Sequence, residues 1–268
     1  MIPQKTIQDL LNKHSVLEKD LSKEDIDKKN FAEKSKDLGF TGLEYVNQLY
    51  DDVMKSEDKS SSIKNFILKN NQLASDNGMD NVLIMIDEEG DLAGEDEEKR
   101  LKSIDNHKLW IDTAAEMNCT SVRLNLYGSK DIETWKALSI ESLTKLGEHA
   151  KGTGLNVIVE NHGRITSNVP ELMNVCKCVN MDNVGTLPDL GSFCMADEGY
   201  GSVFNGTCET VYDFYKGVEE MMPKAFAVSA KGGDKWEDIL HKYILYNINV
   251  FFKVMIRLVM FIVRKAGF

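Results

Sequence analysis

The sequence is built from a repeating unit, in which a short β-type run is followed by a stretch of helical character. Six such runs start at residues 43, 82, 121, 155, 184 and 225, so successive starts are 39, 39, 34, 29 and 41 residues apart. A strand, a helix and two loops need roughly 30 residues or more. The repeat therefore predicts parallel strands joined by helices, with the runs in GLEYV, NVLIMID, SVRLNLYG, LNVIVENHG, VGTLPDLG and AFAVSAKGG.

The segments between these runs have the spacing of amphipathic helices. We expect helices at residues 102–117, 132–151 and 209–222. The second is followed by Gly152 and the third by Pro223, both of which are typical of helix ends. The serine-rich segment 56–62 and the acidic run 95–98 are interpreted as solvated loops or helix starts.

Alternating strands and helices leave two architectures, an open doubly wound sheet or a closed barrel. The first strand-to-helix turns carry no glycine-rich phosphate loop, which removes support for the nucleotide-binding open sheet. Because polar residues gather late in the strands, we expect an α/β fold of the TIM (β/α)8 type. The 268 residues are expected to form one such domain.

Composition excludes several classes of protein. The chain has 43 acidic and 32 basic residues and a formal net charge of -11, which argues against a nucleic-acid partner. The N-terminus lacks the apolar core of a signal peptide, so a cytoplasmic location is expected. The five cysteines are too irregularly spaced for a disulfide scaffold and are interpreted as reduced thiols.

The last stretch, residues 244–268, is apolar and has no acidic residue. A membrane anchor is one interpretation, but Lys253 and Arg257 interrupt the span, and we favour an amphipathic barrel helix. The abrupt change in composition also suggests a truncation or a frame error in the coding sequence.

Candidate functional side chains lie late in the strands. Alternate strand residues share a face, which pairs Arg123 with Asn125, Glu160 with His162, and Ser229 with Lys231; Asp189 and, less certainly, Glu44 join them. In a barrel these positions converge on one mouth. A glutamate, an aspartate and a histidine from neighbouring strands suit a divalent ion such as Mn²⁺, Mg²⁺, Co²⁺ or Zn²⁺.

Each of these residues also has a structural interpretation. Glu160 could form an ion pair, His162 could hydrogen-bond a neighbouring loop, and Asp189 could cap a following helix. Arg123 and Lys231 could pair with these carboxylates rather than with a substrate. His107, in the middle of a predicted helix, is interpreted as a packing or hydrogen-bonding residue.

The motifs carry a family resemblance over residues 38–231. The strings GLEYVNQLY, NVLIMIDEEG, DNHKLWIDTAAEMNCTSVRLN, VIVENHG, GTLPDLGSF and MPKAFAVSAK occur in order. They resemble the sugar phosphate isomerase/epimerase family, which has the xylose isomerase-like barrel. The combination of ENHG, LPDLG and VSAK is far more specific than any one of them.

The resemblance implies one divalent metal, held by a glutamate, an aspartate, a histidine and a second glutamate on the last four strands. Glu160 matches the first ligand and Asp189 the second, whereas the histidine position falls in AVSAK, which offers Ser229 and Lys231. The final glutamate is expected on an eighth strand, beyond residue 268. We therefore expect strands two to seven of an incomplete barrel, with divergent segments at 1–37 and 244–268.

The resemblance implies a metal-dependent isomerase or epimerase that acts on a sugar or sugar-like polyol through an enediolate, impaired by loss of the last strand. Glu160 and Lys231 are the expected catalytic residues, His162, Arg123 and Asn125 the substrate contacts, and Glu160 and Asp189 the metal ligands. The expected partner is a small-molecule sugar, without nucleic acid or membrane; the oligomeric state is open, and a homo-oligomer is compatible with the sequence. The alternatives are an inactive remnant barrel that binds ligands and, less favoured, an abasic-site endonuclease.

Overall fold

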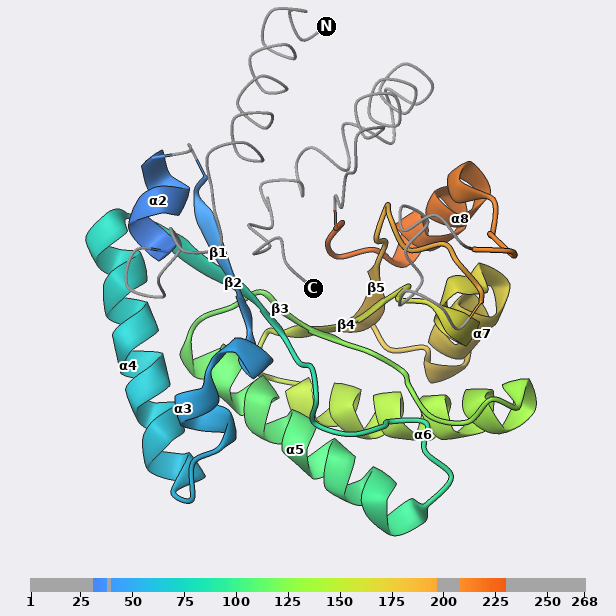
Figure 1. The fold of residues 1–268 in the computed structure, drawn as a ribbon, viewed down its shortest axis with the longest axis horizontal. Coiled ribbons are helices and arrows are strands. Elements are labelled where there is room, and N and C mark those ends of the chain that lie inside the picture. Colours follow the sequence, from blue (N-terminus) through green and yellow to red (C-terminus); the bar gives the residue numbers. More distant parts are fainter. Residues whose placement is uncertain (1–30, 38–39, 197–207, 230–268) are drawn as a thin grey trace, which may run out of the picture.

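The computed structural model describes residues 31–37, 40–196 and 208–229 (Figure 1). The elements, in chain order, are α2 (Phe31–Asp37), β1 (Gly42–Val46), the 3-10 turn η1 (Asn47–Leu49), α3 (Asp51–Met54), α4 (Lys59–Asn77), β2 (Asp80–Met85), α5 (Glu97–Glu116), β3 (Ser121–Leu124), α6 (Ile132–Ala150), β4 (Asn156–Glu160), η2 (Arg164–Ser167), α7 (Val169–Val179), β5 (Val184–Leu187), α8 (Phe214–Met221) and η4 (Met222–Lys224). The segment expected at 244–268 and nearly all of 1–37 lie outside these ranges. Within them, no helix combines the length and the apolar character needed to cross a bilayer.

Five parallel strands form one sheet in the order β1-β2-β3-β4-β5, so each strand pairs with its neighbour in sequence. Helices α4 to α8 follow one another around the outside of this sheet, each in contact with the next or with the strands it connects (Figure 1). This arrangement confirms the parallel strand–helix repeat and the TIM-barrel-type α/β class.

Alternation along the strands separates two apolar layers. One set of strand residues, including Ile84, Val122 and Val157, packs against the helices. The opposite set faces the interior of the curved sheet and forms a smaller cluster of Leu83, Met85, Ile158, Leu187 and Ala227. Because side chains alternate along a strand, the polar residues that follow this inner set also face inward.

Aspartates set the starts of four helices. Asp58, Asp96, Asp131 and Asp213 each accept a hydrogen bond from the backbone N–H three residues later, at the first turns of α4, α5, α6 and α8. The segments 56–62 and 95–98 are therefore helix starts, as interpreted. The helices expected at 102–117 and 132–151 are confirmed as α5 and α6.

The helix expected at 209–222 is shorter, because α8 begins at Phe214. Residues before it are held against the loop after β5: Tyr212 N–H donates to the Phe193 carbonyl, and Met195 N–H donates to the Thr210 carbonyl. These bonds keep the backbone extended until Asp213 caps the helix. The periodic apolar pattern could not reveal this tertiary contact.

The sixth run, at residues 225–229, pairs with β5 in parallel but forms no continuous strand. Its two bridges join Thr186 to Ala225 and Asp189 to Ser229. One segment advances three residues while the other advances four, which leaves one residue unpaired, and Pro188 offers no N–H to the ladder. The predicted sixth strand therefore has the expected position and parallel direction, but it pairs through two isolated bridges instead of a continuous ladder.

The expectation that all cysteines are reduced is wrong for two of them. Cys194 and Cys208 form a disulfide with a Cα–Cα separation of 5.8 Å. Of the others, Cys119 and Cys176 are buried and Cys178 is exposed. Burial raises the pKa of the Cys119 thiol to about 12 and that of Cys176 to about 11, so neither is a reactive thiolate.

The loops that follow β2 and β3 are joined at Gly128, and this junction should be sensitive to a side chain. Ala93 N–H donates to the Tyr127 carbonyl and Ser129 N–H donates to the Ala93 carbonyl. Gly128 has φ 149°, and a Cβ there would collide with the Ala93 carbonyl group.

We predict that Gly128→Ala destabilises the protein more than Gly152→Ala. Gly152 also has positive φ, 93°, but open space around it, so its substitution carries backbone strain of about 1–3 kcal/mol without a collision. Urea unfolding of both variants measures the difference. Equal losses of unfolding free energy would contradict the close approach at Gly128.

We predict that purified, unreduced protein presents three reactive thiols to Ellman's reagent after denaturation, and five after reduction. Cys208→Ser should lower the free energy of unfolding by about 3 kcal/mol, because the disulfide closes a loop of about 15 residues. The matched control is Cys178→Ser, an exposed free thiol. Five thiols without reduction would show that the bridge does not form.

Candidate active site

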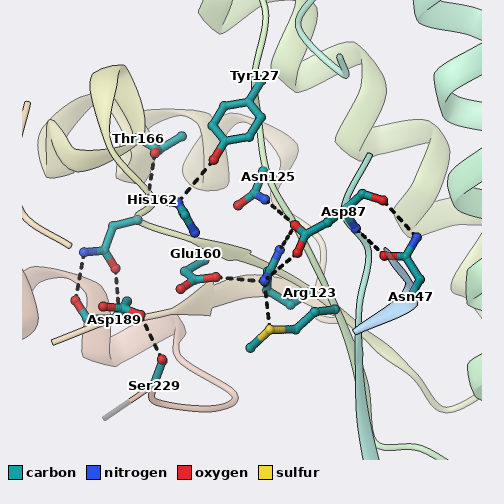
Figure 2. Close-up of polar contacts among 12 residues, drawn as sticks. Asn47, Asp87, Arg123, Asn125, Tyr127, Glu160, His162, Thr166, Asp189 and Ser229 are labelled. Atoms are coloured by element: carbon teal, nitrogen blue, oxygen red, sulfur yellow. Dashed lines mark hydrogen bonds and ion pairs between the residues drawn. The ribbon is translucent and has the colours of Figure 1, made fainter. Parts of the chain in front are cut away.

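The inward-facing polar residues gather where β3, β4 and β5 end, at the carboxyl side of the sheet (Figure 2). Arg123, Glu160 and Asp189 are each 0% exposed, and Asn125 is 8% exposed. On the inner face, Glu160 follows Ile158 by two residues, and Asp189 follows Leu187 by two residues. Arg123 lies beside Met85 on the neighbouring strand. The sheet thus brings together the strand-end residues that the sequence singled out.

Arg123 lies at the centre of this group. Its Nε is 2.8 Å from Glu160 Oε2, a contact that is an ion pair rather than an aligned hydrogen bond. Its Nη1 donates to Asp87 Oδ1 at 2.6 Å. Burial would lower the pKa of the guanidinium, but the carboxylates of Glu160, Asp87 and then Glu44 outweigh burial, and the net pKa is raised.

The ion-pair alternative therefore describes Arg123 and Glu160 as the structure has them. A guanidinium enclosed in this way cannot reach a substrate unless one of its carboxylate partners moves. We interpret Arg123 as a group that positions the two carboxylates, rather than as the direct substrate contact that the sequence suggested.

Asp87 is a site residue that the sequence reasoning missed. It follows β2 and its side chain is 17% exposed. Besides Arg123, it accepts a hydrogen bond from Asn125 Nδ2 at 2.9 Å. The sequence pattern could have revealed Asp87, since Leu83, Met85 and Asp87 alternate along one face, as Arg123 and Asn125 do on the next strand.

Asn47 fixes the backbone of Asp87 from the loop after β1. Its Oδ1 accepts from the Asp87 N–H at 2.7 Å, and its Nδ2 donates to the Asp87 carbonyl at 2.9 Å (Figure 2). Both backbone polar groups of Asp87 are thereby satisfied by one buried side chain. The position of the carboxylate is set before any ligand binds.

Asn125 presents an acceptor to the interior. Because Nδ2 donates to the Asp87 carboxylate, the amide orientation is fixed. The Oδ1 of Asn125 is buried and has no hydrogen-bond partner in the described part of the chain. An unsatisfied buried acceptor carries a free-energy cost that a hydroxyl donor would relieve. This is compatible with the predicted role of Asn125 in substrate contact.

Glu44, the less certain candidate, is 9% exposed and lies opposite Leu83. A shift of register between Leu43 and Glu44 sets this pairing. Its carboxylate is close enough to Arg123 to favour the charged guanidinium. Glu44 therefore contributes negative charge to the group around Arg123.

His162 lies at the mouth, half-buried, with Nδ1 3.2 Å from the Tyr127 hydroxyl. Its backbone N–H donates to Thr166 Oγ1, which holds the turn after β4. Arg164 follows with φ 53° and its guanidinium carbon 5.7 Å from the centre of the Tyr127 ring. Burial, as the main cause, raises the pKa of Tyr127, so its hydroxyl stays protonated.

Asp189 is held by protein donors. Ser229 Oγ donates to its Oδ2 at 2.8 Å, and Gly191 N–H donates to its Oδ1 at 2.8 Å. Its backbone N–H donates to Asn161 Oδ1, and Asn161 Nδ2 donates to its carbonyl. The bond from Gly191 N–H closes a tight turn, and no helix begins within the described residues 190–196, so the interpretation of Asp189 as a helix cap is wrong.

The remaining two candidates are Lys231 and His107. Lys231, the expected second catalytic residue, lies outside the described residues. His107 is buried in α5 with Nδ1 2.7 Å from the Ser103 carbonyl, and burial lowers its pKa, which agrees with a structural role.

The described residues do not fit the metal site that the family resemblance implied. Glu160 is paired with a guanidinium, Asp189 accepts bonds from Ser229 and Gly191, and a hydroxyl stands at the expected histidine position. Across the described part of the chain, no three His, Cys, Asp or Glu side chains converge so as to hold a metal ion.

We predict that Arg123→Met lowers the free energy of unfolding by about 3–5 kcal/mol, because it removes the guanidinium that contacts the buried carboxylate of Glu160. Glu160→Gln in the same chain should restore part of that loss, with a coupling of about 0.5–3 kcal/mol in a double-mutant cycle measured by urea unfolding. Strictly additive losses would show that the two side chains do not interact.

Solved structures share this fold at low sequence identity. The 3-keto-D-glucoside 4-epimerase YcjR from E. coli aligns with a TM-score of 0.61 at 13% identity, covering 82% of both chains. A D-psicose 3-epimerase from Clostridium cellulolyticum H10, solved with D-tagatose, gives 0.60 at 15%, covering 83% of this chain and 78% of the other. A xylose isomerase-like TIM barrel protein from Mycobacterium smegmatis in complex with magnesium gives 0.54 at 17%, covering 76% and 67%.

A different similarity covers a short stretch. Over 55 residues, 20% of this chain, the sequence is 53% identical to peptide chain release factor 1 of Pelagibacter ubique (strain HTCC1062). The chain spans 14% of the release factor's length, so the similarity does not indicate release-factor activity for this protein.

The family model described as the xylose isomerase-like TIM barrel matches residues 32–244, which include every described strand and helix except the first residue of α2. The resemblance drawn from ENHG, LPDLG and VSAK is thereby confirmed. The chain belongs to the xylose isomerase-like TIM barrel family.

Proposed function

We propose that the protein is an isomerase or epimerase that acts on a sugar or sugar-like polyol by moving a proton at a carbon next to a carbonyl group. Membership of the family supports this reaction class, and so do the sugar epimerases that share the fold. The partner we propose is a small-molecule sugar.

The observation that carries the proposal is a buried carboxylate at the mouth of the barrel. Glu160 is the last residue of β4, is 0% exposed, and is aligned by Arg123. In barrels of this type, active sites are built at the carboxyl ends of the strands. A carboxylate whose position is fixed before the substrate binds can act as a general base.

In this proposal Glu160 removes the proton from the substrate carbon and Arg123 keeps the carboxylate oriented. The negative charge that develops on the substrate oxygen needs hydrogen-bond donors placed in advance. His162, fixed by Tyr127 and Thr166, is the described residue that we assign to this oxygen. Lys231 remains a proposed catalytic residue, since it follows the bridge at Ser229 by two residues.

Asn125 is assigned to a substrate hydroxyl. Its amide is oriented by Asp87, and its buried Oδ1 has no partner among the described residues. A hydroxyl-rich ligand offers the donor that this acceptor needs, whereas an apolar ligand would leave it unsatisfied.

A second function is favoured by one observation. Both carboxylates, Glu160 and Asp189, are already engaged by protein donors. This arrangement also suits a barrel that binds a polyol without turning it over.

We predict that the native chain exchanges one carbon-bound proton of a ketose with solvent deuterium, and that Glu160→Gln slows the exchange at least about 10²-fold, the usual contribution of a general base. The probes are D-fructose, D-tagatose and D-psicose, followed by NMR in D₂O. The matched control is Glu133→Gln, the same change at an exposed glutamate on α6. This variant should exchange the substrate proton at the native rate.

An exchange rate that is unchanged in Glu160→Gln would remove Glu160 from the chemistry. Saturable binding of these sugars without any exchange by the native chain would favour the binding function instead.

A further inference from the structure

The carboxylates of this barrel are organised around a protein cation. Arg123 lies between Glu160 on β4 and Asp87 after β2, with its Nε 2.8 Å from the first and its Nη1 2.6 Å from the second. Glu44 adds a third negative charge close to the guanidinium. Arg123 thus places one permanent positive charge among these three acidic side chains, in direct contact with two of them.

A divalent metal on Glu160 would have to share that carboxylate with the guanidinium. Both side chains of the ion pair are 0% exposed, so water would screen the repulsion between two cations poorly. Arg123 cannot relieve the repulsion by losing its proton, because an arginine side chain stays charged in proteins. It cannot swing away freely either, since Nη1 and Nη2 are both directed to Asp87.

Asp189 is similarly engaged. Ser229 Oγ donates to one oxygen and Gly191 N–H to the other, so the carboxylate acts as an acceptor for two short hydrogen bonds. Ser229 is 1% exposed and supplies a neutral hydroxyl, which ranks below imidazole, thiolate and carboxylate as a ligand for Mn²⁺ or Zn²⁺.

We propose that Arg123 is the resident cation of this site, which positions Glu160 and Asp87, and that Glu160 and Asp189 do not bind a divalent metal tightly in the native chain. The inference concerns the same site as the proposed function but does not depend on the reaction. It separates this chain from the metal-binding pattern that its motifs otherwise resemble.

The test measures binding of Mn²⁺ to the full chain by electron paramagnetic resonance and calorimetry, after dialysis against a chelator. For the native chain we expect no Glu160-dependent site with a dissociation constant below about 1 mM. Arg123→Gln removes this positive charge from beside Asp87, Glu160 and Glu44, so it should bind Mn²⁺ at least about tenfold more tightly. Adding Glu160→Gln to that variant should abolish the gain.

Two further variants keep the test decisive. Arg123→Lys retains a charge and should gain no affinity, and Arg164→Gln, which removes an exposed arginine of the next loop, should bind Mn²⁺ as the native chain does. A purely structural role for Arg123 would change stability in Arg123→Gln without creating the Mn²⁺ signal, and would contradict the proposal.

If Arg123→Gln does not fold, the native chain and Glu160→Gln still decide the matter. Micromolar Mn²⁺ binding by the native chain that is lost in Glu160→Gln overturns the proposal, whereas binding that is absent or unaffected by Glu160→Gln supports it. Neither result depends on turnover of a sugar, so failure of the proposed function would be seen separately.

Discussion

The ion pair between Arg123 and Glu160 is the interaction on which the interior of this barrel depends. Two oppositely charged side chains, each 0% exposed, lie in contact there, and each offsets part of the cost of burying the other. Asp87 extends the pair to the neighbouring strand, and Asn47 anchors Asp87 through both of its backbone polar groups. The site thus draws on the ends of β2, β3 and β4 and on the loop after β1.

The same arrangement links stability to function. Glu160 and Asn125, which we assign to the substrate, are both oriented by groups that contact Arg123 or Asp87. The loops that follow β2 and β3 are tied together at Gly128, so the backbone that carries Asp87 and Tyr127 is fixed from outside the barrel as well. Preorganisation of this kind is what a proton-transfer site requires.

Much of this could be predicted from the sequence, because strand alternation is a local property. It placed Glu160, Asp189, Arg123 and Asn125 at one mouth, and the same alternation would have added Asp87 and Tyr127 had it been carried past each strand. The partners could not be predicted: spacing alone does not show whether Arg123 faces a substrate or a carboxylate.

Contacts between loops were equally hidden. The disulfide between Cys194 and Cys208 and the late start of α8 depend on how the chain returns to the loop after β5. Disulfides are typical of oxidising compartments, so this bridge does not support the predicted cytoplasmic location. That location stays a prediction.

The most direct measurement is a crystal structure of the full chain grown in Mn²⁺, with an anomalous difference map recorded at the manganese edge. We expect Arg123 in contact with Glu160 and Asp87, and no anomalous peak on Glu160 or Asp189. A manganese peak bridging Glu160 and Asp189, with Arg123 displaced from Glu160, would contradict this expectation.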